Sequence, residues 1–345
     1  MSGRVAGEDV GEIAAALQGL GLLARGEHLS LAALGGGVSC DVWRVELASG
    51  PVCVKRALAI LRVAADWRAP AGRAASEVAW LRLIAAIEPE WVPRILGEDR
   101  ERHLFVMEFL PPDSYPVWKS QLALGCVEVE FAARVGAALA RIHAQTANRS
   151  DIAERFANRE QFHALRIEPY LLHAATRHDG ASKTIRDIAA GIETARIALM
   201  HGDVSPKNIL CGPHGPVFLD AETVAYGDPA FDLAFCLNHL LLKCVWHPRW
   251  TQAYLQSFSA LKASYLAGAN WEDASLLEAR AAHIVPALLL ARIDGKSPVE
   301  YLTAEDDKNF VRERALTFLQ RPSRSLDEVR SLWATALDVS SRKNY

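Results

Sequence analysis

The chain has 345 residues, of which 50% are hydrophobic and 23% are charged, and its formal net charge is −3 at pH 7. It can bury a large core and exceeds the roughly 100–200 residues usual for one domain, so we expect two lobes. The near-neutral charge supplies no basic surface for nucleic acid and no polybasic arm for a membrane. We therefore expect no nucleic-acid partner and no membrane partner, and the sequence leaves open a monomer or a homodimer.

The six cysteines are scattered and form no C-x-x-C pair or metal-ligand spacing. Buried free thiols in a reducing cytosol explain this pattern most simply. The N-terminus lacks the features of a secretory signal, and no apolar run approaches the roughly 20 residues that span a bilayer. We expect a cytoplasmic protein.

Residues 8–23 carry Val10, Ile13, Leu17 and Leu20 at helical spacing, which predicts a leading amphipathic helix. Short apolar runs and one further helix follow as far as residue 110. We expect this part of the chain to form the small lobe.

A glycine-rich turn joins two of the expected strands. Gly35, Gly36 and Gly37 precede the alternating apolar residues of 42–47. Glycines at such a turn let backbone N–H groups approach phosphates closely, so we assign these three residues to nucleotide binding. The pattern G-x-G-x-x-C-x-V has Cys40 where the glycine loop of protein kinases has its third glycine. A plain hairpin is the alternative.

Lys55 ends the β-branched run 51–55, and Glu77 lies within a predicted helix over 73–84. In a kinase-type site, a lysine on a strand contacts the nucleotide phosphates and is held by a glutamate on a helix. Lys55 and Glu77 fit these two positions. A solvated strand end and a surface helix residue are the alternatives.

The apolar run 103–110 stops at Pro111 and Pro112, as a strand leading into a hinge would. Backbone groups around Glu108 and Leu110 are then candidates to bind the adenine edge, with Met107 behind the base. An ordinary strand followed by a proline-terminated loop is the alternative.

The stretch from His201 to Asn208, followed by the apolar run that ends at Asp220, is the most informative part of the chain. It places a carboxylate, an amide five residues later and a second carboxylate, which a phosphoryl-transfer site of the kinase type requires. Asp203 is the candidate base that orients the attacking hydroxyl, and Asn208 and Asp220 are the candidate Mg²⁺ ligands. We expect His201 to be structural, because Asp203 already fills the role of base. A simple turn is the alternative.

Taken in order, these features resemble the aminoglycoside phosphotransferase and choline kinase group of small-molecule kinases, from about residue 34 to residue 235. The matching residues are Gly35 to Gly37, Lys55, Glu77, Val106 to Pro111, His201 to Asp203, Asp220 to Glu222 and Gly227 to Ala234. The resemblance implies an α+β, protein-kinase-like two-lobe fold. Residues 1–110 would form an N-terminal nucleotide-binding lobe with an antiparallel sheet, and residues 111–345 a mainly helical C-terminal lobe for catalysis and substrate binding. Asp228 and Asp232 would support the catalytic loop.

Two departures from the protein-kinase pattern favour a small-molecule acceptor. Gly202 stands where protein kinases carry the arginine that pairs with a phosphorylated activation loop. Asp220 is followed by Ala221-Glu222, with no room for a long activation segment before Gly227. Glu222 is either a further ligand of the site or a surface carboxylate.

The large lobe should begin with a long helix over 127–146, in which His143 is a satisfied core residue. By resemblance, the acceptor binds in the region 111–200 and after the metal motif. The candidate acceptor residues are Arg166, Tyr170, Glu222, Arg292 and Asp294. Solvated helix ends are the alternative for the segments 166–170 and 291–296, whose charges stand beside Pro169 and Gly295.

We therefore predict a kinase that transfers the γ-phosphoryl group of ATP, with Mg²⁺, to a hydroxyl of a sugar, an amino alcohol or an aminoglycoside-like acceptor. GTP is a second possible nucleotide, because backbone contacts at a hinge do not select the purine. The arginines of residues 312–345 favour a sugar or an amino alcohol over a polycationic aminoglycoside. A non-catalytic nucleotide-binding scaffold or sensor is the alternative, against which the presence of Lys55, Asp203, Asn208 and Asp220 argues.

Overall fold

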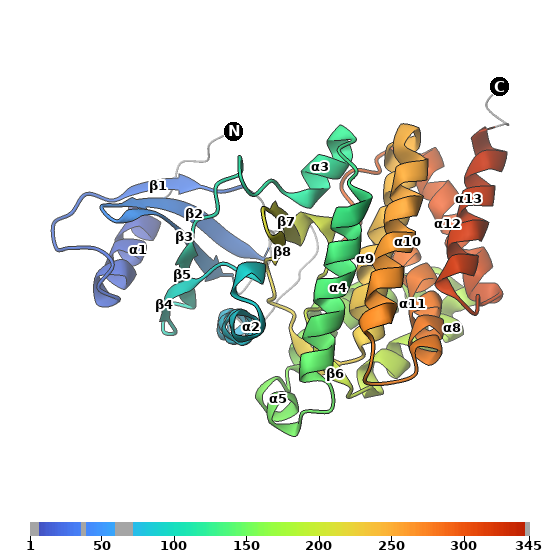
Figure 1. The fold of residues 1–345 in the computed structure, drawn as a ribbon, viewed down its shortest axis with the longest axis horizontal. Coiled ribbons are helices and arrows are strands. Elements are labelled where there is room, and N and C mark those ends of the chain that lie inside the picture. Colours follow the sequence, from blue (N-terminus) through green and yellow to red (C-terminus); the bar gives the residue numbers. More distant parts are fainter. Residues whose placement is uncertain (1–6, 36–38, 59–71, 342–345) are drawn as a thin grey trace.

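The computed structural model describes residues 7–35, 39–58 and 72–341, so Gly36 and Gly37 of the predicted phosphate loop lie outside the described residues. The described chain forms a small lobe built on a sheet and a larger, mainly helical lobe (Figure 1). This arrangement confirms the α+β two-lobe fold that the sequence predicts.

The small lobe is built on a five-stranded antiparallel sheet with the strand order β1-β2-β3-β5-β4. Its strands are β1 (Ser30–Ala33), β2 (Cys40–Leu47), β3 (Gly50–Ala57), β4 (Ile95–Asp99) and β5 (Leu104–Glu108). The helices of this lobe are α1 (Gly7–Gly19), α2 (Arg73–Ile87) and the 3-10 helix η1 (Pro89–Trp91). α1 confirms the predicted leading helix.

The side-chain alternation of β3 aims its residues at two different helices. Val52 and Val54 pack with Ile13 of α1, whereas Cys53 packs in the core that includes α2. Because successive side chains of a strand point to opposite faces, Lys55 lies on the α2 face with Cys53. The period of the strand therefore aims the Lys55 ammonium at Glu77 of α2.

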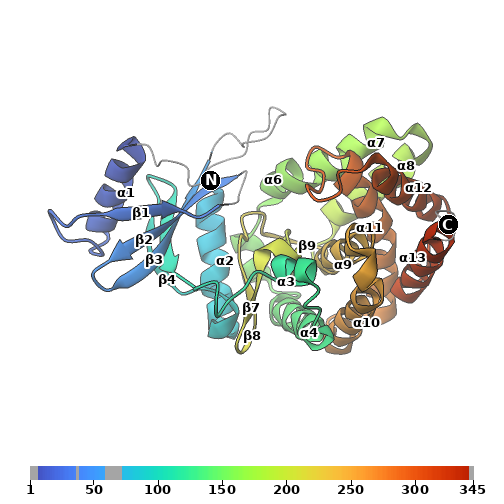
Figure 2. The ribbon, with the colours of Figure 1, turned by 90° about the horizontal axis from the view of Figure 1, so that it is seen from above.

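The large lobe follows β5 and is mainly helical (Figure 2). Its α-helices are α3 (Trp118–Leu124), α4 (Val129–Thr146), α5 (Ser150–Arg155), α6 (Arg159–Phe162), α7 (His173–Arg177), α8 (Asp179–Thr194), α9 (Pro229–Trp246), α10 (Thr251–Gly268), α11 (Ala274–Asp294), α12 (Glu305–Gln320) and α13 (Leu326–Ser341). Its other elements are the π-helix η2 (His163–Leu172), the 3-10 helices η3 (Pro206–Asn208) and η4 (Pro248–Trp250), and the strands β6 (Ala198–Met200), β7 (Ile209–Gly212), β8 (Gly215–Phe218) and β9 (Ala225–Gly227).

α9 is the central helix of the large lobe. Every residue from Pro229 to Val245 is buried, and the helix packs against α10, α11 and β6. A helix that is apolar around its whole circumference belongs in a core. The polar residues that α9 carries into this core, among them Asp232, His239 and Lys243, are therefore costly to bury unless other groups compensate them.

α11 is the one helix among the described residues that is long and apolar enough to cross a membrane. The sequence predicted no such stretch, because Arg280 and Arg292 interrupt the continuous apolar run of this helix. Most of its most apolar segment is buried, and it packs against α9 and α12. Its position in the core of the large lobe accounts for its composition.

Pro169 lies inside the π-helix η2, and not at the turn that the sequence suggested. Proline lacks the backbone N–H that an α-helix would need at this position. A π-helix is wider than an α-helix and is rare outside single turns that often occur at functional sites. The backbone N–H of Lys296 donates to the Pro169 carbonyl at 2.8 Å. η2 thereby connects the segment after α11 with Arg166 and Tyr170.

Candidate active site

The two lobes meet at Lys55. Its Nζ donates to both carboxylate oxygens of Glu77, at 2.7 and 2.8 Å, and to Oδ1 of Asp220 at 2.5 Å. Burial alone would lower the pKa of Lys55, but Asp220 and Glu77 raise it well above its ordinary value. Lys55 is therefore protonated, and its ion pairs join α2 of the small lobe to the segment after β8 in the large lobe.

Asp220 follows the β7–β8 hairpin in an unusual backbone conformation. Its φ is +65°, a region in which aspartate occurs more often than most non-glycine residues. Burial would raise the pKa of Asp220, but Lys55 and Lys207 outweigh it and lower the pKa below its ordinary value. Asp220 is therefore an anionic ligand group, with its side chain 24% exposed.

Asp203 is a buried carboxylate between two cations. The guanidinium Nη2 of Arg166 lies 2.8 Å from Oδ2 of Asp203, and the Lys207 ammonium lies 3.3 Å from the same oxygen. Burial would raise the pKa of Asp203, but Arg166 and Lys207 lower it below its ordinary value. Asp203 is ionised at neutral pH and can accept a hydrogen bond from a hydroxyl group.

The backbone at Gly202 explains why this loop has a glycine before Asp203. Its φ is +81°, and a Cβ atom there would lie 2.6 Å from Oγ1 and 2.7 Å from the carbonyl oxygen of Thr223. Only glycine fits both the backbone conformation and the space. The Thr223 hydroxyl donates to the carbonyl of His201 at 3.0 Å, so the loop is fixed against the segment that follows Asp220.

His201 occupies a structural position beside Asp203. Its Nε2 lies 3.0 Å from the carbonyl oxygen of Leu219, and its Nδ1 accepts from the backbone N–H of Asp203 at 3.1 Å. The ring also packs edge-on against Trp80 of α2. His201 thus links the loop of Asp203 to the strand end that carries Asp220.

Asp232, on α9, holds the same loop by hydrogen bonds to its backbone. Its two carboxylate oxygens accept from the backbone N–H groups of His201 at 2.7 Å and Gly202 at 2.8 Å. His143 Nε2 lies 3.3 Å from Asp232, and its Nδ1 lies 2.8 Å from the hydroxyl of Tyr265. Because a carboxylate only accepts, Nε2 of His143 donates to Asp232. These contacts place His143 in a satisfied core network.

Asp228 braces a different part of the lobe. Its Oδ1 accepts from the backbone N–H of Ala230 at 3.0 Å, which caps the start of α9. Both of its oxygens also bind Arg280 of α11, at 3.0 and 3.1 Å. The two aspartates of this segment therefore have different contacts. Asp232 binds the loop of His201 and Gly202, whereas Asp228 binds the start of α9 and Arg280 of α11.

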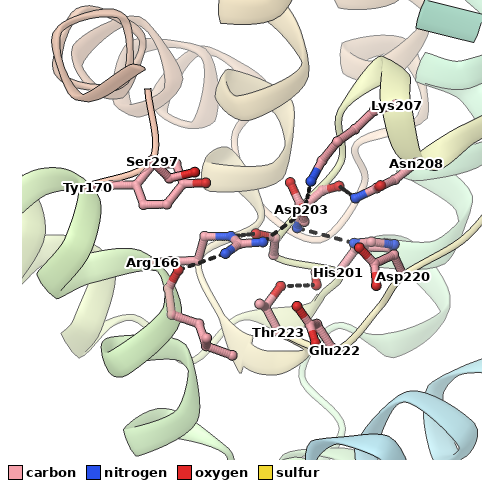
Figure 3. A network of polar contacts seen from close by, with 12 residues as sticks. Arg166, Tyr170, His201, Asp203, Lys207, Asn208, Asp220, Glu222, Thr223 and Ser297 are labelled. Atoms are coloured by element: carbon pink, nitrogen blue, oxygen red, sulfur yellow. Dashed lines mark hydrogen bonds and ion pairs between the residues drawn. The ribbon is translucent and has the colours of Figure 1, made fainter. Parts of the chain in front are cut away.

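Asn208 and Asp220 fit a hard divalent cation. The Asn208 amide nitrogen donates to the carbonyl oxygen of Asp203 at 3.1 Å, so the amide oxygen is the atom left for a ligand. Carboxylate and amide oxygens are the donors that Mg²⁺ accepts, together with water and phosphate oxygens. Figure 3 shows Asn208 and Asp220 on the same side of Asp203.

A second group of possible metal ligands fits less well. Ligand atoms of Cys40, Asp220 and Glu222 lie within 4.8 Å of one another. Burial raises the pKa of the Cys40 thiol far above its ordinary value, and a protonated thiol is a poor ligand for a hard cation. Glu222 Oε2 is already bound by Arg73 Nε at 2.8 Å. Glu222 is only 5% exposed, which excludes the surface carboxylate that the sequence left open.

The remaining predicted nucleotide residues among the described ones are Met107, Glu108, Leu110 and Gly35. Met107 and Glu108 end β5, with Met107 buried and Glu108 exposed. The backbone N–H of Glu108 donates to the carbonyl of Arg94 at 2.9 Å, so that group is already engaged by the protein. Leu110 is partly buried in the connection to the large lobe, and Gly35 has open space around its Cα.

Three of the predicted acceptor residues come together on the other side of Asp203. Arg166 lies 5.3 Å from the Tyr170 ring centroid, and Arg292 Nη1 donates to the Tyr170 hydroxyl at 3.1 Å. In Figure 3, Tyr170 and Ser297 lie opposite Asn208 and Asp220 with respect to Asp203. Asp294 does not join this group, because His178 and Arg312 bind its carboxylate at 2.8 Å.

Sequence reasoning missed several residues of this region. Lys207 contacts Asp203, and its position four residues later in the same loop was the available signal. Ser297, His239 and Lys243 gave no such signal. Only the tertiary packing brings Ser297 to Arg292, and His239 within range of Arg292 and Lys243.

Solved structures establish the wider fold. A choline kinase from Cryptosporidium parvum Iowa II superposes with a TM-score of 0.55 and 13% identity, over 96% of this chain and 99% of that one. An ethanolamine kinase from Plasmodium vivax gives a TM-score of 0.50 and 14% identity, over 85% of this chain and 82% of that one. At these identities the likeness concerns the fold alone, and it confirms the predicted kinase-like fold.

Relatives in sequence are methylthioribose kinases. That of Pectobacterium carotovorum subsp. carotovorum (strain PC1) is 26% identical over 217 residues, which cover 55% of this chain and 54% of that protein. That of Geobacillus sp. (strain WCH70) is 23% identical over 265 residues, with 68% and 65% covered. The chain spans about half the length of the first of these relatives and about two thirds of the second.

The family model that matches is that of the phosphotransferase enzyme family, over residues 30–277. The matched region includes Lys55, Glu77, Asp203, Asn208 and Asp220. Because it covers more than half of the sequence, the chain belongs to the phosphotransferase enzyme family.

Proposed function

We propose that this protein is a small-molecule kinase that transfers the γ-phosphoryl group of ATP to a hydroxyl group. The observation that carries the proposal is the convergence of Lys55, Asp203, Asn208 and Asp220 at the junction of the lobes. Residues 1–110 would bind the nucleotide and residues 111–345 the acceptor. GTP is a second possible nucleotide, because backbone contacts at the hinge would not select the purine.

Asp203 would act on the acceptor hydroxyl. Its ionised carboxylate accepts the hydroxyl hydrogen bond and fixes the direction of attack on the γ-phosphorus. As the new O–P bond forms and the bond from phosphorus to the bridging oxygen breaks, the hydroxyl proton passes to Asp203. The low pKa of Asp203 makes it a weak base, which suits a loose transition state in which the proton leaves late.

The remaining residues would position the nucleotide and its cation. Lys55, held by Glu77, would contact the phosphates, and Asn208 with Asp220 would hold Mg²⁺. The bound cation would neutralise charge on the phosphate oxygens. Lys55 now contacts Asp220 directly, so the phosphates would enter between these two side chains and separate them.

The proposal extends to cellular location and assembly. All six cysteines are free, which accords with a reducing compartment, and we place the protein in the cytoplasm as a monomer or a homodimer. A non-catalytic scaffold would retain the fold but would not need an ionised, buried Asp203 held between Arg166 and Lys207. We therefore prefer the enzyme.

The test is Asp203→Ala in an assay of ADP release from Mg²⁺-ATP with sugars, amino alcohols, hydroxy acids and aminoglycosides. Loss of the base and of hydroxyl orientation should lower kcat by about 10²-fold or more, since positioned proton transfer contributes about 10²–10⁴-fold. Nucleotide affinity should change little, because Asp203 does not contact Lys55. Near-normal turnover by this variant would remove Asp203 from the chemistry.

A further inference from the structure

Several cations lie around Asp203 and Tyr170. Arg166 and Lys207 contact Asp203 itself, and Arg292 contacts Tyr170 next to it. The set continues along α9, where Lys243 stands one turn beyond His239. This region is where the acceptor of the proposed kinase would bind.

Arg292 is a buried guanidinium without a carboxylate partner. It is 6% exposed, and its Nη1 donates to the Tyr170 hydroxyl and to the carbonyl and hydroxyl oxygens of Ser297. Its Nε has no hydrogen-bond partner, and no carboxylate of the described residues forms an ion pair with it. A buried charge is expensive to leave in this state, because its desolvation is not offset by an opposite charge.

Lys243 is the second buried cation without an acidic partner. It is 1% exposed, and its Nζ lies 3.6 Å from the ring centroid of Tyr301 and 4.3 Å from that of Trp246. In the part of the chain that the structure describes, Lys243 makes no ion pair. Two aromatic faces offset part of the charge, but they leave its hydrogen-bond donors for a ligand.

The local charge balance is positive. Arg166, Lys207, Lys119, Lys243 and Arg292 act on Tyr170 or His239, and the carboxylates that act on this group of residues are Asp203, Glu300, Asp220 and Glu222. Glu300 is exposed and pairs with Lys119. Burial would raise the pKa of Tyr170, yet Arg292 and Arg166 lower it. Burial, Arg292 and Lys243 together lower the pKa of His239 well below its ordinary value.

This balance opposes a polycationic acceptor on electrostatic grounds. An ammonium group here would meet an excess of positive charge and two cations with no counter-ion, so its binding would be opposed by repulsion and desolvation. A negative group would do the opposite, because it would supply the missing counter-ion to Arg292 and Lys243. A planar guanidinium is also suited to bind carboxylate or phosphate oxygens in pairs.

We propose that the acceptor is a hydroxyl compound that carries an anionic group, a carboxylate or a phosphate, and that Arg292 and Lys243 bind this group. The inference rests on the proposed kinase activity, because it locates the acceptor beside Asp203. The hydroxyl would lie at Asp203, and the anionic group would lie toward Tyr170 and Tyr301.

The experiment compares acceptors that differ only in charge. Glycerol, glycerate, glycerol 3-phosphate and 3-amino-1,2-propanediol form one set, and ribose, ribonate and ribose 5-phosphate form another. Their binding to the full-length protein with Mg²⁺-ADP is measured by calorimetry, and their phosphorylation is measured with Mg²⁺-ATP. Comparing the carboxylates with the phosphates shows which of the two anionic groups the site binds.

The inference predicts that an anionic member of a set binds about tenfold or more tightly than its neutral or cationic counterpart, the effect of one charge-assisted hydrogen bond. Arg292→Gln, which keeps a donor for Tyr170, should raise KM for the anionic acceptor by a similar factor and leave kcat nearly unchanged. Lys243→Met, which fills the same space, provides a second variant should Arg292→Gln fold poorly.

Lys296→Gln is the matched control. Lys296 is a neighbouring cation in the same segment, but Glu168 already pairs with it at 2.8 Å, so its removal should not change the preference for anions. Equal or tighter binding of neutral or cationic members would overturn the inference, as would failure of every anionic member to bind at millimolar concentration. Charge-selective binding without any phosphoryl transfer would support the anion site and contradict the proposed kinase activity instead.

Discussion

Asn208 and Asp220 have their ligand atoms arranged by contacts inside the protein. The Asn208 amide nitrogen is held by the Asp203 carbonyl, and Asp220 is held by Lys55. The Asn208 amide oxygen is thereby aimed before any cation binds, whereas the Lys55 contact of Asp220 would be replaced when the phosphates enter. At the scale of single residues, the site is preorganised, which reduces the cost of positioning a ligand.

Asn208→Ala should raise the Mg²⁺ concentration needed for half-maximal activity. We expect this concentration to rise about tenfold or more, because losing even a residue that only hydrogen-bonds to a metal ligand weakens metal binding or activity by about tenfold or more. The measurement is a Mg²⁺ titration of ADP release at fixed nucleotide concentration. If Cys40→Ser produced the shift and Asn208→Ala did not, the cation would belong with Cys40, Asp220 and Glu222 instead.

α9 determines two properties of the site at the scale of elements. Near its start, Asp232 fixes the backbone of His201 and Gly202. Near its end, Lys243 places a buried amine beside Tyr301, and this amine carries a positive charge below about pH 7. A single buried helix therefore positions the catalytic loop and contributes to the charge of the acceptor region.

Asp232→Asn should impair catalysis more than nucleotide binding. An amide offers one oxygen, so one of the two backbone N–H groups would lose its acceptor, and a hydrogen bond to a charged group contributes about 1.5–3 kcal/mol. We expect kcat to fall by about 10- to 100-fold, with nucleotide Kd nearly unchanged.

Asp228→Asn is the control for Asp232→Asn, because Asp228 lies on the same segment but contacts Arg280 and the start of α9. It should lower the free energy of unfolding with a smaller effect on kcat. Equal losses of kcat in the two variants would contradict a specific role of Asp232 in holding the loop.

Lys243 should make stability depend on pH. Burial and Lys119 lower the pKa of Lys243 from 10.5 to about 7, with Arg292 acting in the same direction and Glu300 against it. Between pH 7 and 10 the unfolded chain then binds more protons than the folded chain, so stability rises with pH. Lys243 contributes at most about 1.4 kcal/mol per pH unit to the slope of the free energy of unfolding against pH. Below pH 7 this contribution vanishes, because Lys243 is protonated in both the folded and the unfolded chain.

Urea unfolding of the wild type and of Lys243→Met at several pH values between 7 and 10 measures this slope. The variant should lose the rise in the free energy of unfolding. Lys183→Met, which removes an exposed lysine paired with Asp187, should retain it. Parallel curves for the wild type and Lys243→Met would mean that Lys243 is not a perturbed cation.

Local pattern was sufficient to predict that Asp203, Asn208 and Asp220 lie close together, because they fall within 18 residues of one another. It was sufficient for Lys55 as well, since the alternation of β3 decides which face the side chain takes. Local pattern suggested a turn at Pro169, which lies in a π-helix. It also suggested Asp294 as an acceptor residue, but the Asp294 carboxylate binds Arg312. Lys243 could not be predicted, because it reaches the site only through the packing of α9.

The whole molecule is two lobes joined by ion pairs at the site. Lys55 binds Asp220, and Arg73 binds Glu222, so both contacts join the small lobe to the segment after β8. The nucleotide phosphates would bind at the first of these contacts. The acceptor would approach from the other side of Asp203, where the large lobe supplies Arg166 and Tyr170 (Figure 3). Arg292 donates to the hydroxyl of this tyrosine.

The central claim is that the γ-phosphoryl group of ATP passes to the hydroxyl of a small molecule. The most direct test follows the phosphorus by ³¹P NMR, with the wild type and Asp203→Ala incubated with Mg²⁺-ATP and the acceptor sets. The account predicts a new phosphate ester of an acceptor, formed in step with ADP and absent with Asp203→Ala. Release of inorganic phosphate alone, or phosphate found only on protein, would contradict it.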